Sequence, residues 1–182
     1  ASHLYVELKK KFVESIGCQL DIYKLSSKVG FNELELLINT LNEDNTVHGI
    51  MIQFPLPENL ADQKEKVVCL IKAEKDVDGL HPLNQGLLQR NTGSLLPCTP
   101  SGCLSLIDLA YSDLDLDTLK FEELKNIDLS GKKVVVIGRS ILVGKPVATM
   151  LLNRNATVTI VHSKTKDIQA VCAEADILRS EE

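Results

Sequence analysis

Residues 133–164 read KVVVIGRSILVGKPVATMLLNRNATVTIVHSK, and this stretch decides the fold. Its first five residues form an apolar run, as expected for a strand of a parallel sheet that is covered on both faces. The elements expected after that strand are a helix, a strand, a helix and a strand, at 144–154, 157–161, 166–174 and from Asp176. The resulting β-α-β-α-β order predicts an α/β fold with a doubly wound parallel sheet.

The turn from Gly138 to Gly144 is the candidate phosphate site, because it joins the end of a strand to the start of a helix. Backbone N–H groups and the helix dipole attract phosphate at such a point. The usual dinucleotide pattern is G-x-G-x-x-G, whereas this turn reads GRSILVG and lacks the middle glycine. The turn alone therefore leaves two interpretations open, a nucleotide site and a plain strand–helix connection.

The end of the strand at 157–161 favours NADP over NAD. NAD-binding sheets usually carry an acidic residue about 20 residues after the turn, where it binds the ribose 2′-hydroxyl. Here the strand ends in VHSK, without an acid. Arg139 together with Ser163 or Lys164 suits a 2′-phosphate, which an acid would repel. The alternative for Arg139 is a surface salt bridge.

The composition is that of a globular chain with one large or two small domains. The chain has 182 residues, 44% of them hydrophobic, and a net charge of −5, which argues against a nucleic-acid binder with a broad basic surface. No apolar run approaches the roughly 18 residues of a membrane span. Five scattered cysteines without a C-x-x-C pair predict reduced thiols in an intracellular protein and no structural zinc.

The first hundred residues predict further helices and strands. A helical pattern at 2–16 ends at Gly17, a typical C-terminal residue of helices. Another apolar stripe with helical spacing begins at Leu34. The remaining elements expected are strands at 19–24 and 47–54 and helices at 61–73 and 101–110. Residues 75–100 are rich in Gly, Pro, Asn and Asp and predict a long irregular loop that carries binding groups.

Tyr5 and Lys9 stand four residues apart, so their side chains share one helical face. A buried lysine beside a tyrosine can have a lowered pKa and act in proton transfer. The alternative is an ordinary amphipathic helix, on which this spacing is common. The pair precedes the phosphate-type turn by more than a hundred residues, which is unlike the short-chain dehydrogenases.

Several polar residues of the first hundred are candidates for a ligand site. Gln53 ends an apolar strand, and ligands of open α/β sheets gather at such ends. Of Asp76 and Asp78, one is expected to cap the turn, while the other could receive two N–H donors from a guanidine-like edge of a ligand. His81 is more often structural in such a position, and Cys98 is expected to pack.

The motifs as a set closely resemble the bifunctional methylenetetrahydrofolate dehydrogenase/cyclohydrolase family. The matching stretches, which run from Ser2 to about Leu178, are SHLYVELKKK, VHGIMIQFPLP, KDVDGLHPLNQG, LLPCTPSG, LSGKKVVVIGRSILVGKP and NATVTIVHSKT. The resemblance implies NADP-dependent oxidation of 5,10-methylene-tetrahydrofolate and hydrolysis of the methenyl product to 10-formyl-tetrahydrofolate. Both reactions would use one cleft between two α/β domains, without a metal.

The resemblance also implies roles for named residues. Lys9 would be the catalytic lysine, chiefly in the cyclohydrolase step, and Tyr5 would stack on the folate. Gln53 would bond near that lysine, and Asp78 would hold the pterin amino edge. Arg139 and Ser163 would bind the 2′-phosphate. The cofactor-binding set expected for NADP is Gly138, Arg139, Ser140, Val143, Gly144, His162 and Ser163.

The domain organisation expected is a folate-binding domain at 1–111, a linker or insertion at 112–129 and a Rossmann-like NADP domain at 130–182. Compared with the family, the chain is expected to be truncated at both ends, so an inactive fragment that keeps only nucleotide or partner binding is the alternative function. The resemblance implies a homodimer that acts on a small folate. The net charge and the lack of a long apolar run predict no nucleic-acid or membrane partner. The location expected is the cytoplasm, with mitochondria or another organelle as the alternative.

Overall fold

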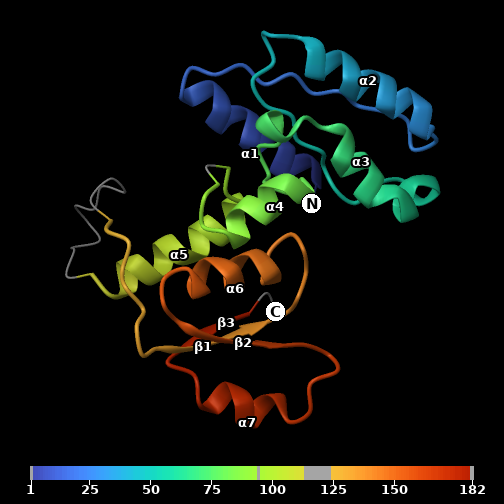
Figure 1. The fold of residues 1–182 in the computed structure, drawn as a ribbon. Coiled ribbons are helices and arrows are strands. Elements are labelled where there is room, and N and C mark those ends of the chain that lie inside the picture. Colours follow the sequence, from blue (N-terminus) through green and yellow to red (C-terminus); the bar gives the residue numbers. More distant parts are fainter. Residues whose placement is uncertain (1, 94, 113–123, 181–182) are drawn as a thin grey trace.

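The computed structural model describes residues 2–93, 95–112 and 124–180, and it separates into a helical first half and a second half built on a sheet (Figure 1). The elements of the first half are α1 (Ser2–Ser15), α2 (Phe31–Glu43), η1 (Glu58–Gln63), α3 (Lys64–Leu70), η2 (Ala73–Lys75), α4 (Pro82–Gln89) and α5 (Cys98–Ala110). Those of the second half are β1 (Lys133–Ile137), α6 (Gly144–Leu152), β2 (Thr157–Val161), α7 (Ile168–Ala173) and β3 (Ile177–Arg179).

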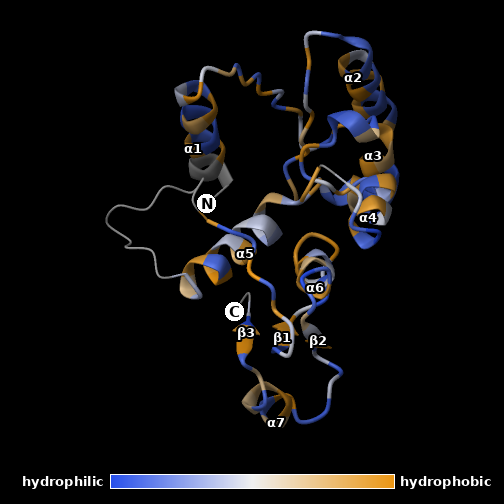
Figure 2. Ribbon diagram, turned by 60° about the vertical axis from the view of Figure 1, so that its left-hand side comes forward, coloured by the Kyte–Doolittle hydropathy of each residue, from blue (hydrophilic) through white to orange (hydrophobic). Residues whose placement is uncertain are grey.

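The sheet confirms the doubly wound α/β prediction. Its strand order is β2-β1-β3, and both pairs are parallel. The central strand β1 buries three successive valines, 134–136, because α6 and α7 lie on opposite faces of the sheet (Figures 1 and 2). The bounds of β1 and β2 agree with the predicted strands residue for residue.

The first helix confirms the sequence prediction, including its end. Gly17 has a φ of +78°, and its N–H donates to the carbonyl of Glu14 at 3.1 Å. The next N–H, that of Cys18, donates to the Val13 carbonyl at 3.1 Å. Both bonds satisfy carbonyls at the end of the helix, in a conformation that glycine adopts without steric cost.

Two of the predicted strands are wrong. Residues 19–24 have no strand conformation, and nearly all of their side chains are exposed. Residues 47–54 make one isolated parallel bridge, between Ile50 and Asp76, and Ile50 N donates to the Lys75 carbonyl at 2.7 Å. The described residues supply no further ladder there, so the apolar character of 47–54 reflects burial against helices and not a sheet.

The predicted long loop at 75–100 is also wrong in part, because it contains α4. Pro82 occupies the first turn, where a missing N–H costs nothing, and the His81 side chain accepts a hydrogen bond from Leu83 N at 3.1 Å. The structural role expected of His81 is therefore confirmed. Cys98, expected to pack, is exposed at the start of α5.

Helices α4 and α5 of the first half pack against the second half, which contains the sheet. Leu88 of α4 and Leu104 of α5 belong to one buried cluster with Val134, Val147 and Leu151 of the second half. A separate cluster holds the N-terminal part together and includes buried residues of α2 and α3. The domain boundaries stay a prediction, since residues 113–123 of the expected linker lie outside the described part.

Candidate active site

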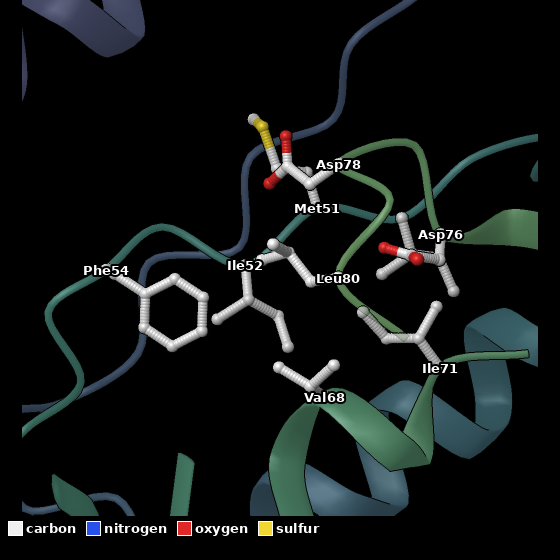
Figure 3. A pocket seen from close by; sticks show the side chains of 9 residues that line it. Met51, Ile52, Phe54, Val68, Ile71, Asp76, Asp78 and Leu80 are labelled. Carbon is white, nitrogen blue, oxygen red and sulfur yellow. The ribbon is translucent and has the colours of Figure 1, made fainter. Parts of the chain in front are cut away.

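A pocket in the N-terminal part lies between the segment 50–54, α3 and the turn that follows η2. Seven apolar side chains and two carboxylates, Asp76 and Asp78, line it. Figure 3 shows the two carboxylates at separate positions along the pocket, with apolar side chains such as Ile52 and Val68 below them.

Lys9 reaches this pocket from α1. Its Nζ lies 3.2 Å from the Sδ of Met51, one of the lining residues, and the lysine is partly buried. Burial raises the pKa of the Asp78 carboxyl, and the positive charge of Lys9 opposes that rise. Residues 9, 51 and 78 therefore meet at one site although they are far apart in the sequence. Tyr5 lies one turn earlier in α1, and its side chain lies outside the described part.

The two aspartates of the KDVDG motif have different surroundings, which resolves the choice that the sequence left open. Asp76 is only 2% exposed, and its Oδ2 accepts hydrogen bonds of 2.8 Å from His81 N and from the Asn84 side chain. Asp78 is partly exposed and lines the pocket. Asp76 is thus the residue that shapes the turn, and Asp78 is the one available to a ligand.

Burial raises the pKa of the Asp78 carboxyl above its ordinary value. The Lys9 ammonium opposes this shift, and the Asp76 carboxylate adds to it. A carboxylate that is short of solvent and of donors gains from a ligand that brings N–H groups.

Gln53 is exposed, and its Nε2 donates a hydrogen bond of 3.0 Å to the neighbouring Phe54 carbonyl. The Gln53 side chain thus bonds to nearby backbone, which is the structural alternative to binding a ligand. The role expected of Gln53 beside Lys9 stays a prediction.

Met51, Phe54 and Leu80 line the pocket and were not singled out from the sequence. The Lys64 ammonium lies 4.7 Å from the centre of the Phe54 ring, a cation–π contact at the side of this pocket. The sequence offered one signal for Met51, Phe54 and Leu80, which is that they lie inside the VHGIMIQFPLP and KDVDGL motifs. An apolar residue in a motif is otherwise indistinguishable from a core residue.

The turn after β1 brings its glycines into close contact. Gly138 has a φ of +105°, and its N–H donates to the Val161 carbonyl at 2.8 Å. A Cβ on Gly144 would lie 2.4 Å from the carbonyl oxygen of Gly138. Helix α6 therefore starts in direct contact with the turn, which no residue other than glycine permits.

Ser140 lies in the turn, four residues before α6 begins at Gly144. Its Oγ accepts hydrogen bonds from Val143 N at 3.1 Å and Gly144 N at 3.2 Å, and its carbonyl accepts from Lys145 N at 2.9 Å. The first amides of α6 are thus bonded inside the turn, contrary to the open amide cradle that the sequence suggested. The Ser140 hydroxyl keeps its own hydrogen to donate to a phosphate.

The register of the sheet places the second half of the expected cofactor set beside the turn. Ile137 pairs with Val161, so Gly138 and Arg139 leave β1 next to His162 and Ser163. Arg139 and Ser163 are exposed. His162 closes its own turn, because its Nδ1 accepts from Lys164 N at 3.2 Å.

The described ranges contain no group of three or more His, Cys, Asp or Glu side chains that could hold a metal ion. Within the same ranges, no helix combines the length and apolar character that a membrane span requires.

The fold and the two sites define a class, the two-part α/β proteins with a nucleotide-type turn in one part and a lysine–carboxylate pocket in the other. Two family profiles match, "Tetrahydrofolate dehydrogenase/cyclohydrolase, catalytic domain" over residues 1–78 and "Tetrahydrofolate dehydrogenase/cyclohydrolase, NAD(P)-binding domain" over 97–180. The chain belongs to the tetrahydrofolate dehydrogenase/cyclohydrolase family.

Individual relatives agree with this assignment. The "Bifunctional protein FolD" of Listeria innocua is 45% identical over 98% of this chain and 57% of its own length. The crystal structure of the bifunctional enzyme FolD from Campylobacter jejuni gives a TM-score of 0.85 at 42% identity, over 98% of this chain and 58% of that one. The Trypanosoma brucei enzyme, "complexed with NADP cofactor and inhibitor", gives 0.84 at 35%, over 98% and 56%. The chain thus spans little more than half the length of these relatives.

Proposed function

We propose that the protein containing this chain oxidises 5,10-methylene-tetrahydrofolate with NADP and hydrolyses the methenyl product to 10-formyl-tetrahydrofolate. The single observation that carries this proposal is that Lys9 contacts Met51 in the wall of the pocket that Asp78 also lines, and that its charge acts on the Asp78 carboxyl. The apolar side chains have the chemistry to contact an aromatic heterocycle, and the Asp78 carboxylate has the chemistry to accept hydrogen bonds from its amino edge.

Asp78 is proposed to hold the pterin. Its two carboxylate oxygens can accept parallel hydrogen bonds from the amino group and the adjacent ring N–H, as in other bidentate pairs. Because burial makes the ionised form of Asp78 costly, these donors replace lost water, and binding is strengthened.

Lys9 is proposed to act in the hydrolysis. Water adds to the cationic methenyl carbon, one carbon–nitrogen bond of the bridge breaks, and one proton is released overall. A neutral lysine amine can take or relay that proton, and it also tolerates the positive charge of the bridge better than an ammonium would. The contact of Lys9 with Met51, which lines the pocket, supports this role.

NADP is proposed as the cofactor, and the residues of the turn fit it. The close approach of Gly144 to Gly138 packs the turn against the start of α6, and the helix dipole favours phosphate at this end. The Ser140 hydroxyl and the exposed Arg139 guanidinium offer donors, and Ser163 adds one from the end of β2. When bound, NADP accepts the hydride from the methylene carbon. The T. brucei relative, whose structure holds NADP, supports this choice.

The first experiment is to assay oxidation of 5,10-methylene-tetrahydrofolate by the 182-residue chain and by any longer protein that contains it, with NADP and NAD in parallel. Methenyl product is read after an acid quench. Turnover with NADP supports the proposal. Turnover by the longer protein alone supports the alternative for this chain, an inactive fragment that keeps nucleotide binding.

The role of Lys9 is tested with Lys9→Ala. Cyclohydrolase activity is expected to fall by about 100- to 10,000-fold, the range of lost acid–base catalysis, while NADP affinity is retained. Lys11→Ala, at an exposed position of the same helix, is the matched control. An equal loss of NADP affinity in Lys9→Ala would contradict the role.

The proposed assembly is a homodimer, which the family resemblance supports. Light scattering on the full-length protein measures its mass in solution. A mass of one chain at micromolar concentration would contradict the proposal.

The proposed compartment is the cytoplasm. All five cysteines are free, as is usual in reducing compartments. Fractionation of the source cells, with antibody detection, tests the location. Recovery only from an organelle fraction would contradict it.

A further inference from the structure

Asp76 is a buried carboxylate outside the chemistry proposed above. It is 2% exposed, and both of its hydrogen bonds reach one oxygen, from His81 N and Asn84 Nδ2, each at 2.8 Å. A carboxylate that is removed from water depends on such donors. Its own main chain opens the turn that carries Asp78, since Gly79 N donates to the Asp76 carbonyl at 3.2 Å.

Asn84 fixes that turn from α4. It is 7% exposed, and its Nδ2 donates both to Asp76 and to the Ala73 carbonyl, each at 2.8 Å. The next residue, Gln85, donates from its Nε2 to the Gly79 carbonyl. Two neighbouring side chains of α4 therefore hold the two ends of the turn, and Asp78 lies between those ends.

The turn has little freedom to relax. Gly79 has a φ of +65°, and a Cβ there would lie 3.0 Å from Pro97. In Figure 3 the Asp78 carboxylate lies beside Met51, the residue that Lys9 contacts, and Asp76 points elsewhere. The direction of Asp78 is thus set by a turn clamped from α4 and from the chain before α5.

We propose that Asn84 is a positioning residue of the folate site, which holds the Asp76 carboxylate and thereby fixes the turn that presents Asp78 to the substrate. This inference rests on the proposed function. It extends that proposal to a side chain that does not line the pocket.

If Asn84 acts through Asp76, substitutions of these two residues should not have additive effects on the free energy of tetrahydrofolate binding. In Asn84→Ala the buried Asp76 carboxylate keeps one donor of two, so the turn rearranges. That rearrangement displaces Asp78. If Asn84 acts through the charge of Asp76, then Asp76→Asn removes most of what Asn84→Ala can still disturb, and the two substitutions are non-additive.

The experiment measures tetrahydrofolate and NADP dissociation constants by titration calorimetry on the full-length protein. Asn84→Ala is expected to weaken tetrahydrofolate binding about 10- to 100-fold and to leave NADP binding within about twofold. In an Asp76→Asn background the same substitution is expected to change tetrahydrofolate binding less than about threefold. Leu83→Ala, 56% exposed on the same helix, is the matched control and is expected to bind both ligands normally.

Equal weakening of both ligands, or additive losses in the double variant, would overturn the inference and leave a purely structural role. If Asn84→Ala does not fold, Gln85→Met tests the same clamp from its other end, with the same selectivity for tetrahydrofolate expected. Unsubstituted protein that binds tetrahydrofolate without turnover overturns only the proposed reaction. Protein that binds no tetrahydrofolate overturns both.

Discussion

The Asp108 carboxylate of α5 is paired with the Arg154 guanidinium just after α6, and the two side chains are only 5% and 17% exposed. Asp108 also accepts a hydrogen bond from Ile127 N at 3.0 Å, and Arg154 donates to the Asn126 side chain at 2.8 Å. One buried ion pair thus joins α5, the end of α6 and the segment that enters β1.

Breaking this pair should destabilise the protein. Asp108→Ala is expected to lower the free energy of unfolding by about 3 kcal/mol, because it leaves the Arg154 charge buried without its partner. Urea denaturation measures the change. Glu174→Ala, which breaks the exposed pair of Lys133 and Glu174, is the control and should have little effect. Similar losses in both variants would contradict the role of burial.

Asp78 should make stability depend on pH. Its pKa is raised on folding, so the folded state holds a proton that the unfolded state releases, and stability falls as pH rises from about 4 through the folded pKa. Asp78→Asn removes the titrating group and with it this fall in stability. The free energy of unfolding of the variant, relative to the unsubstituted protein, should therefore rise as pH increases through the folded pKa of Asp78 and be constant above it. Urea denaturation at a series of pH values measures both proteins. A difference that is constant with pH would contradict the raised pKa.

Gly144→Ala should damage the nucleotide turn. The new methyl group would lie 2.4 Å from the Gly138 carbonyl oxygen, so the start of α6 must move. A loss of about 1–3 kcal/mol of stability and at least tenfold weaker NADP binding are expected. Gly102→Ala is the control: no atom lies within 4 Å of its added Cβ in α5, and a gain of about 0.5–1 kcal/mol is expected. Unchanged NADP binding in Gly144→Ala would show that the contact is unimportant.

Ser140→Ala should weaken the start of α6. It removes the acceptor of two N-terminal amides, Val143 N and Gly144 N, and a loss of about 1 kcal/mol is expected from thermal or urea unfolding. Ser105→Ala is the matched control, because the Ser105 hydroxyl bonds to the Ser101 carbonyl within α5 and caps nothing. A larger loss in Ser105→Ala than in Ser140→Ala would contradict the stabilising role of the two bonds to the Ser140 hydroxyl.

The second half of the fold was predictable because its signals are local. Apolar runs of five residues, a turn with glycine at both ends and a helical stripe each specify one element, and the parallel order follows from their alternation. The first half was less predictable. The apolar segment 47–54 has the pattern of a buried strand, but strand formation needs a neighbouring chain, and the described residues give it one bridge, at Ile50.

The candidate site was predictable as a set of motifs and not as an arrangement. The KDVDG motif predicted that one of Asp76 and Asp78 caps the turn, but not which of the two. Burial and two hydrogen-bond donors show that Asp76 is the capping residue, and one donor, Asn84, comes from a helix that the sequence pattern had classed as loop.

The sequence by itself determined the parallel sheet, the phosphate-type turn, the family and the residues that carry its motifs, because these depend on short-range pattern and composition. Only the tertiary structure decided that Lys9 lies beside the pocket that Asp78 lines, that the first amides of α6 are already bonded to Ser140, and that α4 and α5 pack against the half of the chain that contains the sheet. Those facts depend on burial and on contacts between residues far apart in the chain, which no local pattern encodes.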